Sequence, residues 1–329
     1  MRVLLLSIMT AAAAAAQQPV LLVLLKGASA LGYYTLQGEP IAKVPVGQHP
    51  HEMVVTADGR FAFVSDNGVM RIEDGGKGGN TVSVVDLAAR KRVDTIGFGK
   101  FRRPHGLAID PATQRVAVTL EAPESIVAVI DSKGRKILSR FYTGGETAHM
   151  VSFAPGKSGA EHVYVSNSGS GTVTLVQLTS GQQKTLPTGK RPEGSVISPD
   201  GKEMFVCNRD SNTISIIDTE RQAIKGEIKT GDGPVRVAIT PDGKSLIYAC
   251  MRGHYLEFAD LELRRPVARL AVDGEPISIS VSKDGKYALA AVEQKDAVYV
   301  IELPARRLVK KFQVEKGAAP DPVLMVTLP

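Results

Sequence analysis

A proline-containing segment recurs along this chain, and its spacing constrains the fold more than any other feature. One repeated position is occupied by Pro50, Pro104, Ala148, Pro192, Pro234 and Pro276. The successive spacings are 54, 44, 44, 42 and 42 residues, and Pro320 restarts the segment 44 residues after Pro276. Periods of about 40–45 residues are typical of repeat architectures in which each repeat is one supersecondary unit.

Each repeat contains four short runs of β-branched or alternating apolar residues. Turn sequences such as Pro-Asp-Gly-Lys, at 199–202 and 241–244, separate the runs. Such turns favour antiparallel hairpins, and no segment shows a convincing period of 3.6 residues. Four antiparallel strands at this period describe one blade of a β-propeller. WD40 repeats are excluded because the chain has no tryptophan.

The repeats predict seven blades and a ring that is closed by both ends of the chain. The segment from Val20 enters the pattern at its second strand, and the segment after Pro320 supplies the missing first strand. Pairing the two termini in one blade removes the open edges of the ring. We therefore predict an all-β fold, with residues 17–329 forming one propeller of four-stranded antiparallel blades. Asp321 to Leu328 should pair with the strand that begins near Val20, in the blade that we number first.

The first sixteen residues are typical of a secretory signal peptide. Arg2 precedes an apolar segment at 3–9, and an alanine run at 11–16 offers a cleavage site. The apolar segment is shorter than the roughly 20 residues that a spanning helix needs. We expect residues 1–16 to be removed, the mature chain to be periplasmic or secreted, and no membrane span. An uncleaved N-terminal anchor is the alternative.

Composition narrows the partners that this chain can have. The formal charge is +6, but 40 lysines and arginines are scattered among 34 acidic residues, and aromatic residues make up only 5%. Nucleic-acid binding needs a clustered basic face with stacking aromatics, so we expect no nucleic acid. A small-molecule ligand or a partner protein remains, and we expect a monomer. No Cys-x-x-Cys-His motif is present, so covalent haem is not expected.

Two cysteines, Cys207 and Cys250, lie in strand-like segments of neighbouring repeats. Counted from Gly201 and Gly243 of their repeats, they are one position out of register. Side chains alternate between the two faces of a strand, so these two should leave opposite faces of their sheets. We therefore predict buried, unbonded thiols.

The residue directly after each repeated proline marks a candidate site. In blade order these residues are Asp321, His51, His105, His149, Glu193, Val235 and Ile277. Equivalent positions on adjacent inner strands point toward one axis, so these side chains should converge. Imidazoles with a carboxylate suit Zn²⁺, Fe²⁺, Mn²⁺ or Cu²⁺. We predict a metal site formed by His51, His105, His149 and Glu193.

Two carboxylates at the same position are candidates for catalysis. Glu193 or Asp321 would serve as the general base beside a metal-activated water. Without a metal, the same cluster would form a proton-transfer site. The structural alternative is that each histidine only hydrogen-bonds the loop above it.

Further polar residues are expected on the same face of the ring. Arg236, Arg252 and His254, with Arg209, would form a clamp for an anionic ligand, and ordinary solvated surface charge is the alternative. The segment 65–80, "SDNGVMRIEDGGKGGN", makes the second repeat ten residues longer than most. It joins the second and third strands on this face. It is either a lid with glycine hinges or a flexible insertion.

The repeat sequences also resemble a known family. The segments "SPDGKEMFVCNRDSNTISIIDTE" from Ser198 and "TPDGKSLIYACMRG" from Thr240 are similar to the YVTN-type seven-bladed propellers. That family in turn resembles the propeller domain of cytochrome d1 nitrite reductases and the lactonase-type propellers. The resemblance covers Pro19 to Pro329. It implies the fold and an extracytoplasmic location, with roles that range from ligand binding to catalysis.

Two functions of different classes follow from the sequence. The first is a metal-dependent hydrolase or lyase that acts on a small molecule at the axial site. The second is a non-catalytic propeller that binds a partner protein or ligand. Bound metal in the purified protein would separate the two.

Overall fold

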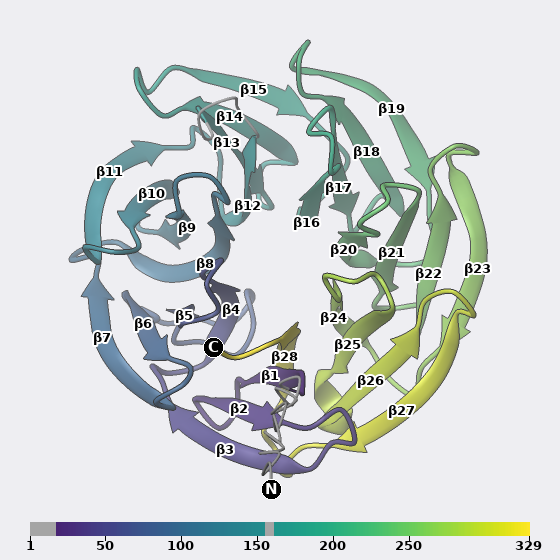
Figure 1. Cartoon of the computed structure of the whole chain (residues 1–329). Helices are drawn as coiled ribbons and strands as arrows, with labels where there is room; N and C mark the ends of the chain where they lie inside the picture. The colour runs from purple at the N-terminus through teal and green to yellow at the C-terminus, as the bar shows by residue number, and fades with distance from the viewer. Residues whose placement is uncertain (1–17, 155–160) are drawn as a thin grey trace, which may run out of the picture.

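The computed structural model describes residues 18–154 and 161–329, so the signal-peptide prediction for residues 1–16 falls outside the described residues. The described chain forms seven four-stranded sheets arranged around a central axis (Figure 1). All pairings within the sheets are antiparallel, as in the pairing of β17 with its neighbours. The predicted all-β, seven-bladed propeller is confirmed.

The strands occupy four concentric positions (Figure 1). The innermost are β4 (Pro50–Val55), β8 (Arg102–Ile109), β12 (Ala148–Ala154), β16 (Pro192–Ile197), β20 (Pro234–Ile239), β24 (Pro276–Val281) and β28 (Pro320–Val326). The second are β1 (Val20–Leu25), β5 (Phe61–Asp66), β9 (Arg115–Ala122), β13 (His162–Asn167), β17 (Glu203–Asn208), β21 (Ser245–Cys250) and β25 (Tyr287–Val292). The third are β2 (Ala30–Tyr34), β6 (Thr81–Asp86), β10 (Ile126–Asp131), β14 (Thr172–Gln177), β18 (Thr213–Asp218), β22 (Tyr255–Asp260) and β26 (Ala297–Glu302). The outermost are β3 (Pro40–Pro45), β7 (Lys91–Gly97), β11 (Lys136–Tyr142), β15 (Gln183–Pro187), β19 (Ala223–Lys229), β23 (Arg265–Ala271) and β27 (Arg307–Gln313).

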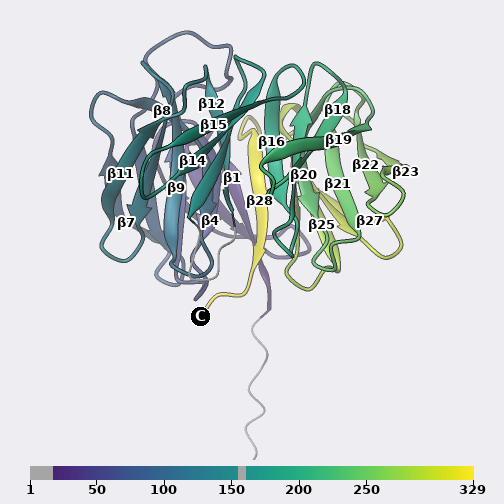
Figure 2. The same cartoon turned by 90° about the horizontal axis from the view of Figure 1, so that it is seen from above.

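Blade 1 combines strands from both ends of the chain. Its order is β28-β1-β2-β3, and Val20 pairs with Val326. The two strands lie side by side at the axis in both views (Figures 1 and 2). This confirms the predicted closure, because Asp321 to Val326 belong to the strand that pairs with β1. Only one short 3-10 helix, η1 (Glu293–Lys295), occurs in the described segments, and no described helix is long and apolar enough to cross a membrane.

The core lies between blades, which explains why the second and third strands are apolar on both faces. In β17, Met204 and Val206 pack against blade 4, whereas Phe205 and Cys207 pack against blade 6. Successive side chains of a strand point to opposite faces, and a neighbouring blade covers each face. The outermost strands are largely exposed, as β19 shows.

Cys207 and Cys250 are free and buried, which confirms the predicted absence of a disulfide. The argument behind that prediction needs correction. Both thiols belong to one apolar cluster, between blades 5 and 6. Opposite faces of neighbouring sheets are the two walls of a single interface, so the alternation brings these cysteines toward each other rather than apart.

Two positions in every blade lie at the same mouth of the axial channel. Each repeated proline pairs with a residue at or near the end of the second strand, as Pro192 pairs with Asn208 and Pro104 with Leu120. One position is the residue after the proline. The other is the residue after its partner, where the chain enters the loop to the third strand. The candidate site is built from these two rings of residues.

Candidate functional site

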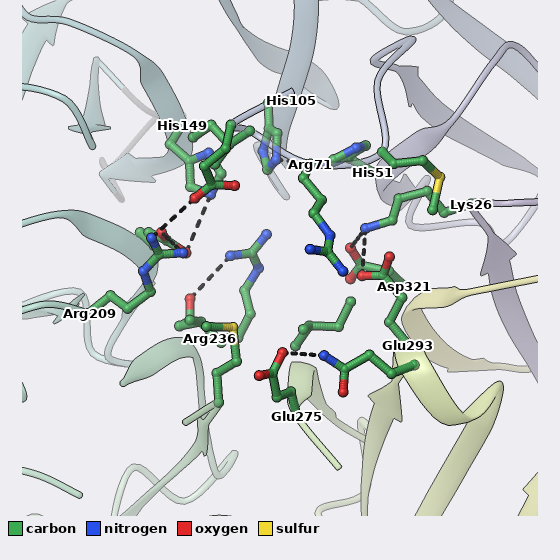
Figure 3. A pocket seen from close by; sticks show the side chains of 18 residues that line it. Lys26, His51, Arg71, His105, His149, Arg209, Arg236, Glu275, Glu293 and Asp321 are labelled. Atoms are coloured by element: carbon green, nitrogen blue, oxygen red, sulfur yellow. Dashed lines mark hydrogen bonds and ion pairs between the residues drawn. The ribbon is translucent and has the colours of Figure 1, made fainter. Parts of the chain in front are cut away.

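A cavity of about 280 Å³ lies at one mouth of the axial channel (Figure 3). Its walls include the residues that follow the repeated proline in all seven blades: Asp321, His51, His105, His149, Glu193, Val235 and Ile277. Arg236 and Arg209 also line it. The structure therefore places the sequence-derived ring of side chains around one space.

The three histidines form a contiguous row on one side of this cavity. The rings of His51 and His105 lie 4.8 Å apart, and those of His105 and His149 lie 3.8 Å apart, between centroids. All three are almost completely buried. Burial lowers the pKa of each imidazole well below 6.5, so the three rings are neutral at neutral pH.

Hydrogen bonds fix which nitrogens of the row carry protons. His51 Nε2 lies 2.8 Å from the carbonyl oxygen of Val69, which only accepts, so this nitrogen donates. The Nδ1 atom of a neutral His51 is then an acceptor. It lies 3.0 Å from His105 Nε2, which therefore donates to it. The proton of His105 is thus on Nε2, and its Nδ1 atom presents a bare lone pair.

Glycine and threonine explain why His105 and His149 approach so closely. A Cβ atom on Gly106 would lie 2.4 Å from the carbonyl oxygen of His149, so only glycine fits between β8 and β12. The hydroxyl of Thr119 accepts from the amide of Gly106 at 2.8 Å and donates to the carbonyl of His149 at 2.7 Å. This bridge holds the two inner strands together and sets the spacing of their histidines.

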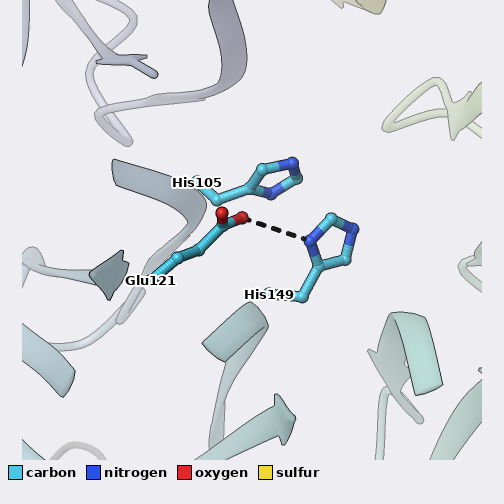
Figure 4. A group of neighbouring side chains, drawn as sticks. All are labelled: His105, Glu121 and His149. Carbon is cyan, nitrogen blue, oxygen red and sulfur yellow. Dashed lines mark ion pairs between the residues drawn. The ribbon is translucent and has the colours of Figure 1, made fainter. Parts of the chain in front are cut away.

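His105, Glu121 and His149 form the group with metal-ligand geometry (Figure 4). One ligand atom from each residue lies within 4.8 Å of those from the other two. His149 Nδ1 lies 3.8 Å from Glu121 Oε1, which is too far for a hydrogen bond. His105 Nδ1, His149 Nδ1 and Glu121 Oε1 are all buried without a hydrogen-bond partner. Three buried polar atoms without partners around one point are costly, and a bound cation would satisfy them once Glu121 is ionised.

Glu121 is the site residue that the sequence analysis missed. Its side chain is 5% exposed, and its Oε2 atom forms an ion pair with Arg103, 3.1 Å from Nε. Burial raises the pKa of Glu121 to about 8, against the opposing effect of Arg103. The available signal was the second repeated position, directly after the second strand. In blade order that position holds Lys26, Asn67, Glu121, Ser168, Arg209, Met251 and Glu293.

The other two predicted metal ligands lie beside this group rather than in it. Both nitrogens of His51 are engaged, by Val69 and His105, so His51 supports His105 from behind. Glu193 Oε2 lies 3.9 Å from His149 Nε2. Its Oε1 atom pairs with Arg209 Nη1 at 3.0 Å and with Arg191 Nε at 3.3 Å. Burial raises the pKa of Glu193, and Arg209 opposes this.

The opposite side of the cavity consists of paired charges. Asp321 accepts from Lys26 at 3.4 Å, and Lys26 also donates to Glu293 at 3.0 Å. Burial raises the pKa of Asp321, and Lys26 opposes this. Arg236 reaches across the axis to Glu52, with Nη2 2.8 Å from Oε1. Asp321, predicted as a catalytic base, is therefore held by Lys26 in blade 1, which neighbours the blade of His51.

Arg252 and His254 lie on the expected face but outside the cavity wall. Both are exposed. Arg252 donates to Asp232 and Asp210 at 2.9 Å each, at the outer surface of the loops. Of the cations that the sequence suggested as an anion clamp, Arg236 and Arg209 face the cavity.

Comparison with known proteins agrees with this architecture. A model of the YNCE-like β-propeller family matches residues 142–262, from the end of blade 3 into blade 6. The chain is a seven-bladed β-propeller. Over the matched residues this propeller is similar to the YNCE-like family, in keeping with the resemblance that the repeat sequences carry.

Solved structures give the same fold. A chain of Kuenenia stuttgartiensis hydrazine synthase is 21% identical, with a TM-score of 0.70 over 83% of this propeller and 89% of that chain. A functionally unknown protein from Desulfotomaculum acetoxidans DSM 771 is 14% identical, with a TM-score of 0.78 over 94% and 99%. Identities this low show the fold alone. A search of curated proteins found no match.

Proposed function

We propose that this propeller binds one divalent transition-metal ion through His105, His149 and Glu121 and uses it to bind and transform a small molecule in the axial cavity. The observation that carries the proposal is the convergence of three buried polar atoms without hydrogen-bond partners. Two imidazoles with one carboxylate form a common protein ligand set for zinc and ferrous iron, with coordination positions left open.

The surroundings support these ligands. His51 fixes the tautomer of His105 so that Nδ1 faces the group, and Arg103 holds the second oxygen of Glu121. Such supporting hydrogen bonds orient metal ligands and tune their basicity. The structural alternative, in which the histidines only fix the spacing of the blades, explains the bonds of His51. It leaves the three unsatisfied polar atoms without a purpose.

The proposed activity is that of a hydrolase or lyase. A bound divalent ion would act as a Lewis acid and lower the pKa of a coordinated water. Glu193 is placed to take a proton at its Oε2 atom, 3.9 Å from His149 Nε2 and beside the cavity. Asp321 is instead paired with Lys26, and we assign it to that ion pair. The alternative function, a purely binding propeller, requires no proton acceptor there.

Metal stoichiometry tests the proposal. Purified protein is stripped with a chelator, reloaded with Zn²⁺, desalted and measured by elemental analysis. We expect one ion per chain in the wild type and, in His105→Ala and His149→Ala, an affinity at least a hundred-fold lower. His254→Asn is the matched control, because it removes an exposed imidazole outside the cavity and asparagine tolerates its positive φ of 58°.

The result that would reject the proposal is equally clear. Wild type and His254→Asn would then bind no more zinc than His105→Ala does. If zinc binds but no hydrolysis or elimination is found across carboxylic and phosphoric ester substrates, the metal site stands and the catalytic part fails.

The location is a separate part of the proposal. We propose a periplasmic or secreted protein on the strength of the signal-like residues 1–16. Expression of the full chain followed by N-terminal sequencing tests this. Cleavage before Gln17 supports it, and an intact Met1 in a membrane-associated protein would favour the anchor instead.

A further inference from the structure

The loop between β5 and β6, residues 67–80, crosses the mouth of the axial cavity. It leaves blade 2, and its Glu73 pairs with Arg191 and Arg209, which belong to blade 5. Blades 3 and 4, which carry His105 and His149, lie between these two anchor points (Figure 1). The loop therefore passes over the proposed metal site.

This loop divides two cavities. Ile72 and Glu73 line the axial cavity and also a second cavity of about 530 Å³, which reaches Glu121, Arg103 and Arg191. His105 and His149 face the first cavity, whereas Glu121 faces the second. Withdrawal of the loop tip would join the two cavities above the three proposed ligands.

The contact of Glu73 has the geometry of a bound anion. Its Oε1 atom accepts from the Nη2 atoms of both Arg191 and Arg209, the second at 3.3 Å. Two guanidinium groups on one oxygen match the way proteins bind carboxylate and phosphoryl groups. The same arginines also hold Glu193, whose side chain is only 6% exposed and is fixed in the inner strand β16. Glu73 is 53% exposed and is thus the partner that can leave.

The loop is weakly attached around Glu73. Ideal Cβ atoms on Gly75 and Gly76 would meet nothing within 4 Å, so this part of the tip has no packing against the blades. Gly68, Gly76 and Gly78 have positive φ angles, which lets the backbone turn at both ends. The firmest grip is Arg103, which donates to the carbonyl of Ile72 at 2.8 Å while also pairing with Glu121.

We propose that Arg191 and Arg209 form a subsite for the carboxylate or phosphoryl group of a small anionic ligand, and that Glu73 occupies this subsite until such a ligand displaces it. The inference rests on the proposed function in that the ligand is the small molecule of the axial site. It adds the chemical class of that molecule. Glu193 links the subsite to the metal ligands, because it contacts Arg209 through one oxygen and approaches His149 with the other.

Anion binding to metal-stripped protein tests this inference. Isothermal titration with inorganic phosphate and, separately, with succinate measures the affinity of wild type, Glu73→Gln and Glu73→Gln/Arg191→Gln. We expect Glu73→Gln to bind one of these anions about ten-fold more tightly than wild type, because the competing carboxylate is gone. The double variant should lose the gain. Comparison of the two anions tells which group the subsite prefers.

The control is Glu315→Gln, which removes a carboxylate from an exposed pair with Lys43 on the rim of the ring. It should bind both anions as wild type does. Unchanged affinity in Glu73→Gln, or full retention of a gain in the double variant, would overturn the inference. Because the protein carries no metal here, failure of this test leaves the zinc stoichiometry intact, and failure of zinc binding leaves this test intact.

Proteolysis gives a second readout of the loop. Trypsin cleaves after Arg71 and Lys77, and both residues are exposed. Cleavage within 67–80 should be faster in Glu73→Gln than in Glu315→Gln, since the tip is no longer held across the mouth. Equal rates in the two variants would count against Glu73 as the latch.

Discussion

The two sides of the axial cavity use the same repeated positions in different ways. On one side, blades 2, 3 and 4 place His51, His105 and His149 after the repeated proline. That side contains three buried polar atoms, from His105, His149 and Glu121, that have no hydrogen-bond partner. On the other side, blades 6 and 7 place Val235 and Ile277 there, and blade 1 places Asp321, which pairs with Lys26.

The difference shows how a symmetric fold separates structural from functional residues. Position alone brings all seven side chains to one cavity. Where a charge meets an opposite charge, as in Arg236 with Glu52, the two charges neutralise each other without a ligand. Where neutral imidazoles and a carboxylate converge without donors, the group is completed only by a ligand. The unsatisfied atoms, rather than the residue types, therefore mark the site.

The largest effect is expected from breaking a pair on the charged side. Arg236→Met leaves the Glu52 carboxylate buried without its partner, and such changes typically destabilise by about 3–5 kcal/mol. The free energy of unfolding should fall by that amount in urea titrations. The double variant Glu52→Gln/Arg236→Met should recover most of the loss. A single variant as stable as wild type would show that the pair across the axis is not structural.

A second prediction compares blade 2 with blade 6. Asp66 and Glu257 each accept from the amide of a glycine at the start of their blade, Gly47 and Gly231, but Glu257 also pairs with Arg269. Burial raises the pKa of Asp66 to about 6 from 3.8. The folded state thus favours the protonated acid, so this stability is complete below about pH 4 and lost as the pH rises through 6.

The shift corresponds to about 3 kcal/mol between pH 4 and pH 7. Asp66→Asn should flatten the dependence of unfolding free energy on pH over that range. Asparagine fits this position, since Asn167 and Asn208 occupy the equivalent positions in blades 4 and 5. Both donate to nearby hydroxyl groups. Urea titrations at several pH values measure the effect. An identical pH slope in wild type and Asp66→Asn would contradict it.

The fold could be predicted from the sequence because a proline marks the start of the inner strand in nearly every blade. The repeated proline fixes the register of each inner strand, and Pro320 places the last strand in blade 1. The ring after the proline was found for the same reason. Glu121 was not, because the residue after the proline was the only position compared across all seven blades, and the residue type at the second position varies from blade to blade.

The roles of the other site residues depend on hydrogen bonds, and a repeat pattern in the sequence does not show which hydrogen bonds form. His51 supports His105 because its Nε2 atom donates to the carbonyl of Val69, which leaves Nδ1 to accept from His105. Val69 belongs to the long loop of blade 2. Arg252 and His254 follow the second strand of blade 6 by two and four residues. The chain has turned outward there, so they lie on the right face but away from the axis.

A third prediction concerns the close approach of blades 3 and 4. Gly106→Ala places a Cβ atom against the carbonyl of His149, and overpacking of this kind costs about 2 kcal/mol. The inner strands must separate, so zinc affinity should also fall. Gly226→Ala on the exposed strand β19 is the matched control, since its Cβ atom meets nothing within 4 Å. Equal stability and zinc affinity in the two variants would show that the spacing of β8 and β12 does not set the site.

The smallest stability effect is expected from the residue behind the ligands. His51→Phe keeps the bulk of the ring but removes the acceptor that orients His105, for a loss of about 1 kcal/mol. Zinc affinity should nevertheless fall about ten-fold or more, as is usual when the partner of a ligating histidine is removed. Competition with a chromogenic chelator measures this. Unchanged zinc affinity would show that His51 does not orient His105 for metal binding.

Anomalous diffraction from a zinc-soaked crystal tests the central claim most directly. The account predicts one peak among the axial histidines, about 2.0–2.2 Å from His105 Nδ1, His149 Nδ1 and an oxygen of Glu121. His51 should remain hydrogen-bonded to Val69 and His105. A zinc peak bound by His51 and Glu193 would contradict this account. So would the absence of a zinc peak from the cavity after a soak at a saturating zinc concentration.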